Sequence, residues 1–252
     1  MIILNSRQQA LLSKVQREGH ATVEMLAAQF DVTQQTIRRD IGLLADAHLL
    51  QRIHGGASVL SSVENVAYNT RQVMFAEEKK RIACLVAEQI PDHASLFINL
   101  GTTTEEVARA LHRHRGLHVV TNNLNVAAMM CNYPECEVVV ASGVMRPRDM
   151  GIVGESTIEF IRKFRVDFGI IGISSIDADG TLRDFDLREV CTSDAIIRQS
   201  RQVFLVADHS KFGRPAMVEL GPLSRVTALF TDQAPPEAMA SVIAESGVTL
   251  YL

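Results

Sequence analysis

Six of eight consecutive residues near the amino terminus carry side chains suited to contacting DNA. The stretch TQQTIRRD, residues 33–40, has two adjacent arginines with glutamines and threonines just before them. An arginine guanidinium can form two hydrogen bonds with a guanine edge or a phosphate, and a glutamine amide can pair with adenine. The chain carries 25 basic and 29 acidic residues, a net charge of −4, so any nucleic-acid surface must be local. The candidate contacts in this stretch are Thr33, Gln34, Gln35, Thr36, Arg38 and Arg39.

A helix is needed to present these side chains, and the surrounding pattern predicts one. Ile37, Ile41 and Leu44 recur at helical spacing, and the Thr33 hydroxyl can cap the first turn. On such a helix the polar side chains point away from the apolar stripe. Gly42 is unexpected inside the helix, because glycine costs about 1 kcal/mol there relative to alanine.

Two more helices are predicted before this one. The first can end at Gly19, and the second can be capped by the Thr22 hydroxyl. Asp31 and Val32 leave room only for a turn before the third helix, which is typical of helix-turn-helix proteins. The apolar faces of the first two helices are formed by Leu11, Leu12, Val15, Leu26, Ala27 and Phe30.

A hairpin is predicted directly after the helices. Extended residues 49–53 and 57–60 flank His54-Gly55-Gly56, a typical turn sequence, so the first sixty residues predict a winged helix. Arg52 and His54 would then lie on the wing, where contacts to the phosphate backbone or the minor groove are usual. The alternative, an ordinary solvated helix face, would have to explain the turn, the cap and the hairpin as well.

From residue 76 the chain alternates between helical and extended segments. The extended runs are continuously apolar, as in strands buried on both faces, so we expect an α/β domain with a mostly parallel sheet. The expected organisation is a winged helix-turn-helix domain over 1–60, a linker over 61–75 and the α/β domain over 76–252. The extended runs are 95–100, 117–121, 137–141, 166–174, 202–207, 226–231 and 248–252.

A small anionic ligand is predicted at the carboxyl ends of these strands, where open parallel sheets bind their ligands. After the first strand, residues 99–104 read NLGTTT, and with a helix from Glu105 they would gather N–H groups and hydroxyls suited to a phosphate. Lys211, one of only five lysines, follows the fifth strand. Each feature alone is more often structural, but their shared location favours a phosphorylated ligand. The candidate residues are Asn99, Gly101, Thr102, Thr103, Thr121, Asn122, Gly143, Arg146, Asp186, Glu189 and Lys211.

We expect neither a metal ion nor a cofactor. The spacing of His112, His114 and His118 suits no metal site, and Cys131 and Cys136 fit no zinc or redox motif. Neither a GxxxxGK[ST] nor a GxGxxG motif supports nucleotide binding. The four cysteines have no metal-like spacing, and no leader or long apolar run is found, so reduced thiols in the cytoplasm and no membrane association are expected.

Together these motifs resemble the DeoR family of transcriptional repressors over nearly the whole chain. TQQTIRRDIGLLADAHLLQRIHGGA resembles the winged-helix motif of that family, and INLGTT, VTNNLNVA, FGIIGIS and DHSKFG resemble its sugar-phosphate sensor domain. RDMGIVGE and HSKFGRPAMV are most similar to members that respond to glycerol 3-phosphate. The resemblance implies a cytoplasmic, homotetrameric repressor that leaves double-stranded operator DNA when a phosphorylated small molecule, glycerol 3-phosphate, binds.

Several positions depart from the family pattern, which leaves a different sugar phosphate open as the effector. Asn99 stands where aspartate is frequent, Ser142 replaces a second glycine, and Ser193-Asp194 replaces a Lys-Arg pair. The sensor fold also resembles ribose-5-phosphate isomerases, so an enzyme is the alternative function. Those enzymes show G-A-D-E where this chain has residues 172–175, GISS, and serines cannot replace carboxylates in proton transfer. We therefore expect no enzymatic activity.

Overall fold

The computed structural model describes residues 4–18, 20–46, 49–58, 65, 68–73 and 75–252. Within it the chain divides into two compact units, Met1–Val66 and Ala67–Leu252, and each has its own apolar core. The helix end expected at Gly19, the end of the hairpin at 59–60 and much of the expected linker lie outside the described residues. No helix in the described part of the chain combines the length and apolar character needed to cross a bilayer.

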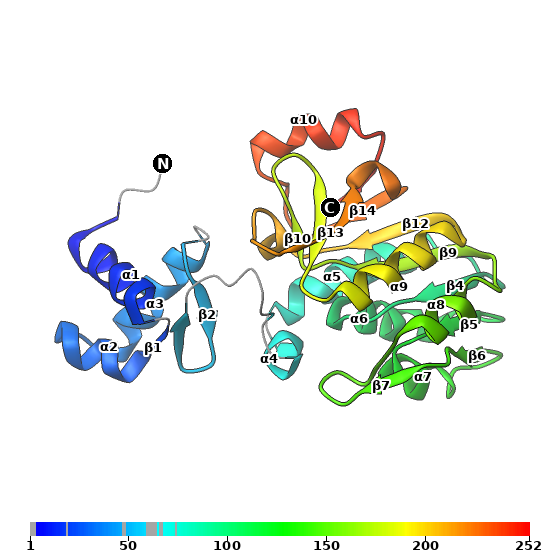
Figure 1. The fold of residues 1–252 in the computed structure, drawn as a ribbon, viewed down its shortest axis with the longest axis horizontal. Helices are drawn as coiled ribbons and strands as arrows, with labels where there is room; N and C mark the ends of the chain where they lie inside the picture. The colour runs from blue at the N-terminus through cyan, green and yellow to red at the C-terminus, as the bar shows by residue number, and fades with distance from the viewer. Residues whose placement is uncertain (1–3, 19, 47–48, 59–64, 66–67, 74) are drawn as a thin grey trace. The chain divides into compact units, whose positions relative to one another are not determined.

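The amino-terminal unit is a three-helix winged helix (Figure 1). The predicted hairpin is present, with Ile53 opposite Gly56 and a two-residue turn between the strands. A third strand, which the sequence did not predict, pairs with the hairpin in the order β1-β3-β2. It has only three residues, too few for a periodic pattern. The elements are α1 Ser6–Glu18, β1 His20–Thr22, α2 Val23–Phe30, α3 Gln34–Asp46, β2 Gln51–Ile53 and β3 Gly56–Ser58.

The predicted caps and turn of this unit are confirmed. Thr22 accepts a hydrogen bond from the backbone N–H of Met25 at 3.2 Å at the start of α2. Asp31 ends α2 in the left-handed region, with φ of 52°. The first hairpin strand is shorter than predicted, because Leu50 packs into the core instead of extending β2.

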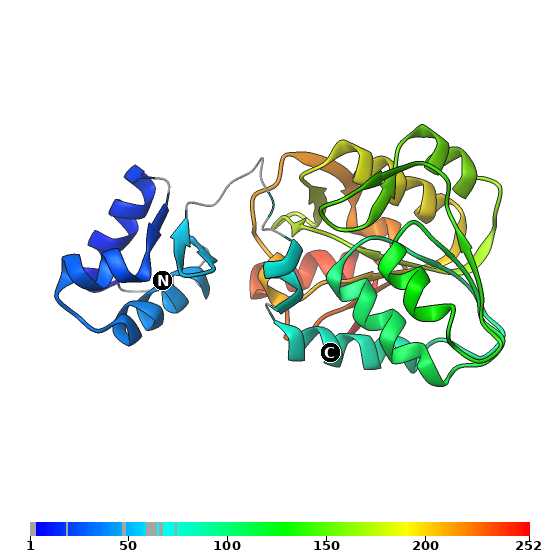
Figure 2. The same cartoon turned by 90° about the horizontal axis from the view of Figure 1, so that it is seen from below.

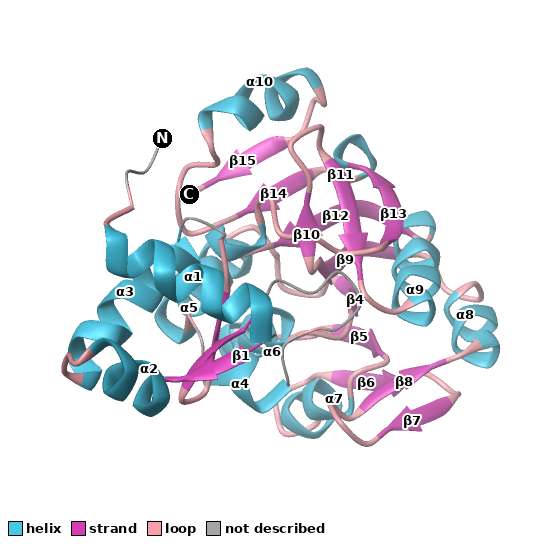
Figure 3. Cartoon of the chain, turned by 60° about the vertical axis from the view of Figure 1, so that its left-hand side comes forward, coloured by secondary structure: helices cyan, strands magenta, loops and turns pink. Residues whose placement is uncertain are grey.

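The second unit is built on a seven-stranded sheet in which all pairs are parallel, in the order β15-β14-β12-β9-β4-β5-β6 (Figure 3). Six of the seven predicted extended runs contain one of these strands, and the run 202–207 overlaps β12, which begins two residues earlier at Ser200. The chain moves outward from β4 to β6 and then resumes on the other side of β4 with β9. The strands are β4 Ser95–Ile98, β5 His118–Thr121, β6 Glu137–Val140, β9 Val166–Gly172, β12 Ser200–Val206, β14 Ala228–Phe230 and β15 Thr249–Tyr251.

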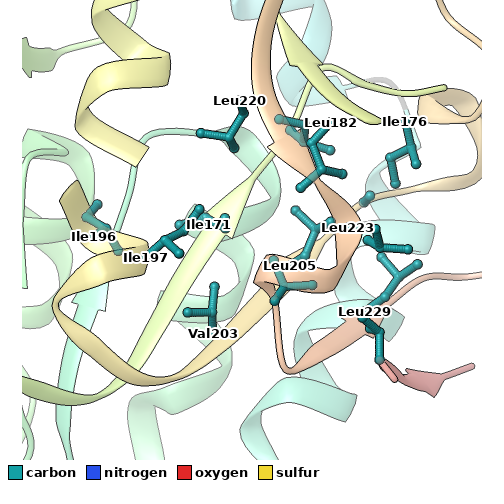
Figure 4. Close-up of a cluster of buried hydrophobic side chains, with 14 of the residues drawn as sticks. Ile171, Ile176, Leu182, Ile196, Ile197, Val203, Leu205, Leu220, Leu223 and Leu229 are labelled. Carbon is teal, nitrogen blue, oxygen red and sulfur yellow. The ribbon is translucent and has the colours of Figure 1, made fainter. Parts of the chain in front are cut away.

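Helices cover both faces of this sheet, which explains why its strands are apolar on both sides. α5 Ala76–Ala87, α6 Thr102–Ala110 and α7 Leu124–Met130 pack on one face. α8 Glu155–Ile161, α9 Leu187–Arg198 and α10 Glu237–Glu245 contribute to the core on the other face. Figure 2 shows α5 to α7 in cyan and green on the opposite side of the sheet from α8 and α9. Figure 4 shows part of the core on the face covered by α8, α9 and α10. The remaining helical segments are α4 Tyr68–Val73, η1 Leu111–Arg113, η2 His209–Lys211 and η3 Leu223–Arg225.

Two small antiparallel sheets were not predicted. One has the order β10-β11-β13, and the other is the pair β7-β8. Their strands have two to five residues each, too short for a clear pattern. The predicted strand 166–174 accordingly ends at Gly172. The small strands are β7 Val144–Arg146, β8 Gly151–Val153, β10 Ser175–Ile176, β11 Thr181–Asp184 and β13 Val218–Pro222.

Candidate functional site

The polar residues predicted to contact DNA lie on the outer side of α3. Ile37 is fully buried, whereas Arg38 and Arg39 beside it are exposed. Arg38 donates a hydrogen bond from Nη2 to Gln34 Oε1 at 2.9 Å, and Gln35 is exposed one turn before Arg39. Donors suited to base edges and phosphates are therefore grouped in the first turns of this helix.

Thr33 and Thr36 have a structural role at the same helix start. Thr33 Oγ1 accepts a hydrogen bond from the backbone N–H of Thr36 at 3.2 Å, and the two hydroxyl oxygens are 3.0 Å apart. The predicted cap at Thr33 is thus confirmed. It fixes the end of α3 that carries the arginines.

Asp40 anchors α3 to α1 from its inner side. Its carboxylate accepts hydrogen bonds from Arg7 Nε at 2.6 Å and from Gln8 Nε2 at 3.0 Å, and Asp40 is 3% exposed. Burial opposes the charged form of Asp40, but the hydrogen bonds from Arg7 and Gln8 outweigh it and lower the pKa of the carboxyl group. Asp40 therefore sets the position of the helix that carries the predicted DNA contacts.

Replacing Asp40 by alanine is expected to lower the free energy of unfolding of the amino-terminal unit by about 2 kcal/mol, because a charge-assisted hydrogen-bond acceptor is lost. The pKa of Asp40 is lower in the folded protein than in the unfolded chain. Its contribution is therefore complete above about pH 4 and is lost as the pH falls through the folded-state pKa. Calorimetric unfolding at pH 7 and pH 3 measures both effects. Asp46→Ala, at an exposed position of the same helix, is the control, and equal stability of the two variants at pH 7 would contradict the assignment.

Packing within the amino-terminal unit does not explain Gly42. A Cβ atom placed on Gly42 would meet no atom of the described residues within 4 Å. Gly42 follows Arg39 by three residues and Arg38 by four, so it lies on the same side of the helix as the two arginines. A side chain at position 42 would therefore have room among the described residues of this unit.

The wing presents Arg52 and His54, which are both exposed. The carbonyl of Gly55 in the turn accepts a hydrogen bond from the backbone N–H of Val23 at 2.7 Å, which ties the wing to the start of α2. Gly56 allows close packing beside it, because a Cβ there would lie 2.2 Å from the Ala21 carbonyl oxygen. The wing is thus held at a fixed place on the helical core of this unit.

In the second unit, the loop after β4 leads directly into α6. The helix begins at Thr102, so the prediction that it begins at Glu105 is wrong by three residues. Gly101 makes the early start possible, because its φ of 142° favours glycine, and Thr104 Oγ1 donates to the Gly101 carbonyl at 2.7 Å. No side chain in the described part of the chain caps α6. The N–H groups of the first turn, with the hydroxyls of Thr102 and Thr103, therefore remain suited to an anion.

Two of the departures from the family pattern are in contact. Asn99, which is 4% exposed, donates a hydrogen bond from Nδ2 to Ser193 Oγ at 2.8 Å. An aspartate and a lysine at these two positions would form an ion pair, whereas the amide and the hydroxyl form a neutral hydrogen bond. In this chain Asn99 and Ser193 therefore satisfy each other without a charge.

The end of β5 combines a structural hydroxyl with an unpaired acceptor. Thr121 Oγ1 donates to the Ile98 carbonyl at 2.6 Å and accepts from the Asn123 N–H at 3.0 Å. Asn122 donates from Nδ2 to the Ile152 carbonyl at 3.1 Å, but its buried Oδ1 has no hydrogen-bond partner among the described residues. Buried polar atoms are nearly always paired. Asn122 Oδ1 is therefore suited to accept a hydrogen bond from a ligand hydroxyl.

Lys211 belongs to a group of four cations, which we call the cationic cluster (Arg71, Lys79, Lys211 and Arg214). Lys211 Nζ is 3.6 Å from Asp208 Oδ2. Burial lowers the pKa of Lys211 and lowers that of Lys79 to about 8. Burial and the charge of Arg71 lower the pKa of Arg214 to about 10. These cations destabilise one another in a buried setting, so an anionic ligand would be stabilising.

Three carboxyl groups share the surroundings of the cationic cluster. Burial opposes ionisation of Asp208, but Lys211 and other donors outweigh it and lower its pKa. Burial raises the pKa of Asp184, which accepts a hydrogen bond from Ser174 Oγ at 2.8 Å. Burial also raises the pKa of Glu189, and the nearby charge of Asp184 raises it further.

Arg146, predicted as an effector ligand, is already engaged by three carboxylates. It lies 2.5 Å from Asp149, 2.9 Å from Asp186 and 2.7 Å from Glu189. Asp186 also caps α9 by accepting from the Arg188 N–H. Arg146 therefore joins the β7-β8 hairpin to the start of α9 and positions Asp186 and Glu189.

The structure thus brings Arg146, Asp186 and Glu189 into one ion-pair group, and places Lys211 in another. Gly143 has a backbone role, since its φ is 147° and a Cβ there would lie 2.1 Å from Thr157 Oγ1. Sequence reasoning missed Arg71, Lys79 and Arg214. In the described part of the chain, no group of three or more His, Cys, Asp or Glu side chains is arranged to hold a metal ion.

Comparison with known proteins identifies relatives of both units. The model of the DeoR-like helix-turn-helix domain matches residues 7–63, and that of the DeoR C terminal sensor domain matches residues 74–233. The chain is 48% identical to the glycerol-3-phosphate regulon repressor of Escherichia coli strain K12 over 98% of both chains. It is 49% identical to the repressor of the same name from Haemophilus influenzae, over 98% of this chain and 96% of the relative.

Among solved structures, the chain has a distant likeness to an isomerase. Ribose 5-phosphate isomerase A from Methanocaldococcus jannaschii aligns with 55% of this chain and 55% of its own, with a TM-score of 0.41 and 12% identity.

Proposed function

Because this chain belongs to the DeoR family of transcriptional regulators, we propose that it represses genes of glycerol and glycerol 3-phosphate metabolism and leaves their operators when glycerol 3-phosphate binds. The observation that carries this proposal is the 48% identity, over nearly the full length, to a glycerol-3-phosphate regulon repressor. The exposed arginines of α3 and the cationic cluster, of which Lys79 and Arg214 are buried, support it. The experiment that tests it is operator binding by the purified protein with and without glycerol 3-phosphate.

For DNA, we propose that α3 enters the major groove and that the wing contacts the backbone. Arg38, Arg39 and Gln35 would contact base edges and phosphates, because they are exposed on one side of the helix. Arg52 and His54 would contact the phosphate backbone or the minor groove. Two subunits would bind the half-sites of an inverted repeat, as symmetric dimers of such domains do.

For the effector, we propose that the phosphate binds between the start of α6 and the cationic cluster. Thr102 and Thr103 would supply hydroxyl and N–H donors, and Lys211 would supply charge. Lys79 joins this set, because it is 3% exposed and its charge interacts with Asp208 and Lys211. The glycerol hydroxyls would pair with Asn122 Oδ1 and neighbouring polar groups at the strand ends.

Release requires that the effector favours the subunit arrangement that does not fit the operator. To change operator occupancy from nearly full to nearly empty, this preference must total about 5 kcal/mol, which several sites in an oligomer can share. We propose a homotetramer in the cytoplasm. Light scattering of the purified protein measures the number of subunits. A monomer would contradict the proposal that several effector sites in one oligomer share this free energy.

A sugar-phosphate isomerase is the second candidate, favoured by one observation. Asp184 is a buried and Glu189 a half-buried carboxyl group, and both have raised pKa values, a property that general acids and bases share. We propose that they hold a ligand without catalysis, because Glu189 is ion-paired with Arg146 and relatives of the chain are named repressors. Incubation with glycerol 3-phosphate and pentose phosphates should give no turnover. Steady conversion of any of them would establish the enzyme instead.

A further inference from the structure

The helix α4, Tyr68–Val73, is the first element of the second unit and is fastened beside the proposed effector site. The Tyr68 hydroxyl donates to the Glu105 carboxylate, and its oxygen lies 2.9 Å from Oε1 and 2.8 Å from Oε2. Asn125 Nδ2 donates to the Tyr68 hydroxyl at 2.9 Å. Glu105 is in the first half of α6, only two residues after Thr103. Tyr68 therefore connects α4 to the helix whose first turn is proposed to bind phosphate.

A second connection joins α4 to the cationic cluster. Lys79 Nζ donates a hydrogen bond to the main-chain carbonyl of Arg71. The charge of Arg71 acts on Lys211 and Arg214, two other members of the cluster, and on the buried carboxyl of Asp184. A change in the charge balance of the cluster therefore alters the electrostatic interaction of Arg71, which belongs to α4.

In the sequence, α4 lies directly after the segment that joins the winged helix to the second unit. β3, the last strand of the winged helix, ends at Ser58, and α4 begins at Tyr68, so residues 59–67 separate the two. Any element that transmits a signal between the units along the chain must include this segment. α4 directly follows this segment and contacts α6, whose first turn belongs to the proposed effector site.

We propose that α4 is the coupling element: a phosphate bound at the cationic cluster attracts Arg71 and strengthens the attachment of α4 through Tyr68 and Glu105, and this change is passed along the chain to the winged helix. The inference rests on the proposed function, because it takes the bound anion to be the phosphate of the effector. Without the anion, repulsion of Arg71 by Lys211 and Arg214 opposes its attraction to Asp184 and weakens the attachment of α4. The operator then binds preferentially to the molecules in which α4 is less firmly attached to α6.

Tyr68→Phe isolates this role because it removes one hydroxyl and leaves the effector site intact. Glu105 keeps hydrogen bonds from Asn123 Nδ2 at 3.0 Å and from Asn125 Nδ2 at 3.1 Å. The variant removes none of the proposed phosphate ligands. Asn69→Ala, at an exposed position of the same helix, is the matched control.

The experiment combines three measurements on the full-length wild type, Tyr68→Phe and Asn69→Ala. Calorimetry gives the affinity for glycerol 3-phosphate, fluorescence anisotropy gives operator affinity with and without it, and hydrogen–deuterium exchange follows residues 68–73. In the wild type, glycerol 3-phosphate should slow exchange in α4 and weaken operator binding. Tyr68→Phe should bind effector and operator separately within about threefold of the wild type. Its effector-dependent loss of operator affinity should be at least about tenfold smaller, and Asn69→Ala should behave as the wild type.

Two outcomes separate this inference from the proposed function. If Tyr68→Phe releases the operator as fully as the wild type, or if exchange in α4 does not change with effector, α4 is not the coupling element and the proposed function stands. If the wild type itself does not bind glycerol 3-phosphate or is not released by it, the proposed function and the inference fail together.

Discussion

The double variant Arg38→Ala, Arg39→Ala should lose at least about 100-fold in specific operator affinity and retain only non-specific binding. A well-formed contact between an arginine and a base contributes about 1–3 kcal/mol of discrimination, and two such contacts are removed. Both side chains are exposed, and the core of the amino-terminal unit does not include them. The unfolding temperature should therefore change little. Anisotropy titrations at fixed ionic strength, with the preferred duplex and with random DNA, measure the loss.

The control for this variant must remove the same charge elsewhere. Arg113 and Arg115 are exposed arginines of the second unit, and replacing both by alanine changes the net charge equally. That control should bind the operator as the wild type does. Equal losses in the two double variants would mean that net charge, and not the α3 face, determines binding.

Lys211→Ala should separate sensing from DNA binding. Removing a charge-assisted contact to phosphate costs about 1.5–3 kcal/mol, so the affinity for glycerol 3-phosphate should fall by at least about tenfold. Operator affinity without effector should stay within about threefold of the wild type, because Lys211 is remote in sequence from the winged helix and belongs to the other unit. Calorimetry and operator release at a series of effector concentrations give both quantities.

Lys163→Ala, at an exposed lysine of the same unit, is the control for Lys211→Ala. Removing Lys211 also takes a partner from the buried carboxylate of Asp208, so the unfolding temperature of each variant must be recorded. A folded Lys211→Ala variant that is released at the same effector concentration as the wild type would place the phosphate elsewhere.

The main elements of the fold could be predicted because their signals are local. Continuous apolar runs indicate the seven strands, since helices cover both faces of the sheet. The caps at Thr22 and Thr33 depend on a hydroxyl placed next to an apolar helical stripe, which is visible in the sequence. The small strands β7, β8, β10, β11 and β13 could not be predicted, because they depend on pairing between segments that are too short to have a pattern of their own.

The candidate effector site was only partly predictable, because its cations come from distant segments. Lys79 precedes Ile82 by three residues and Val86 by seven, so it lies on the buried face of α5, and this spacing could have identified it. Lys80, next to it, is exposed. Arg71 and Arg214 have no such pattern around them, and only the tertiary fold brings their charges to Asp184.

The ion-pair partners of Arg146 could not be predicted from the sequence. Its position after a strand end suggested a ligand for the effector, yet its guanidinium lies in ion pairs with Asp149, Asp186 and Glu189. A sequence can place an arginine near a site, but it cannot tell whether the carboxylates of the fold already occupy that arginine.

The most direct test of the account is a titration of the purified protein with a duplex selected from a random pool, at 0.15 M salt, followed by addition of glycerol 3-phosphate, glycerol or ribose 5-phosphate. The account predicts specific binding to the selected duplex, loss of at least about tenfold in affinity with glycerol 3-phosphate, and no comparable loss with glycerol, which lacks the phosphate. No preference over random DNA, or equal binding in the presence and absence of every phosphorylated compound, would contradict it.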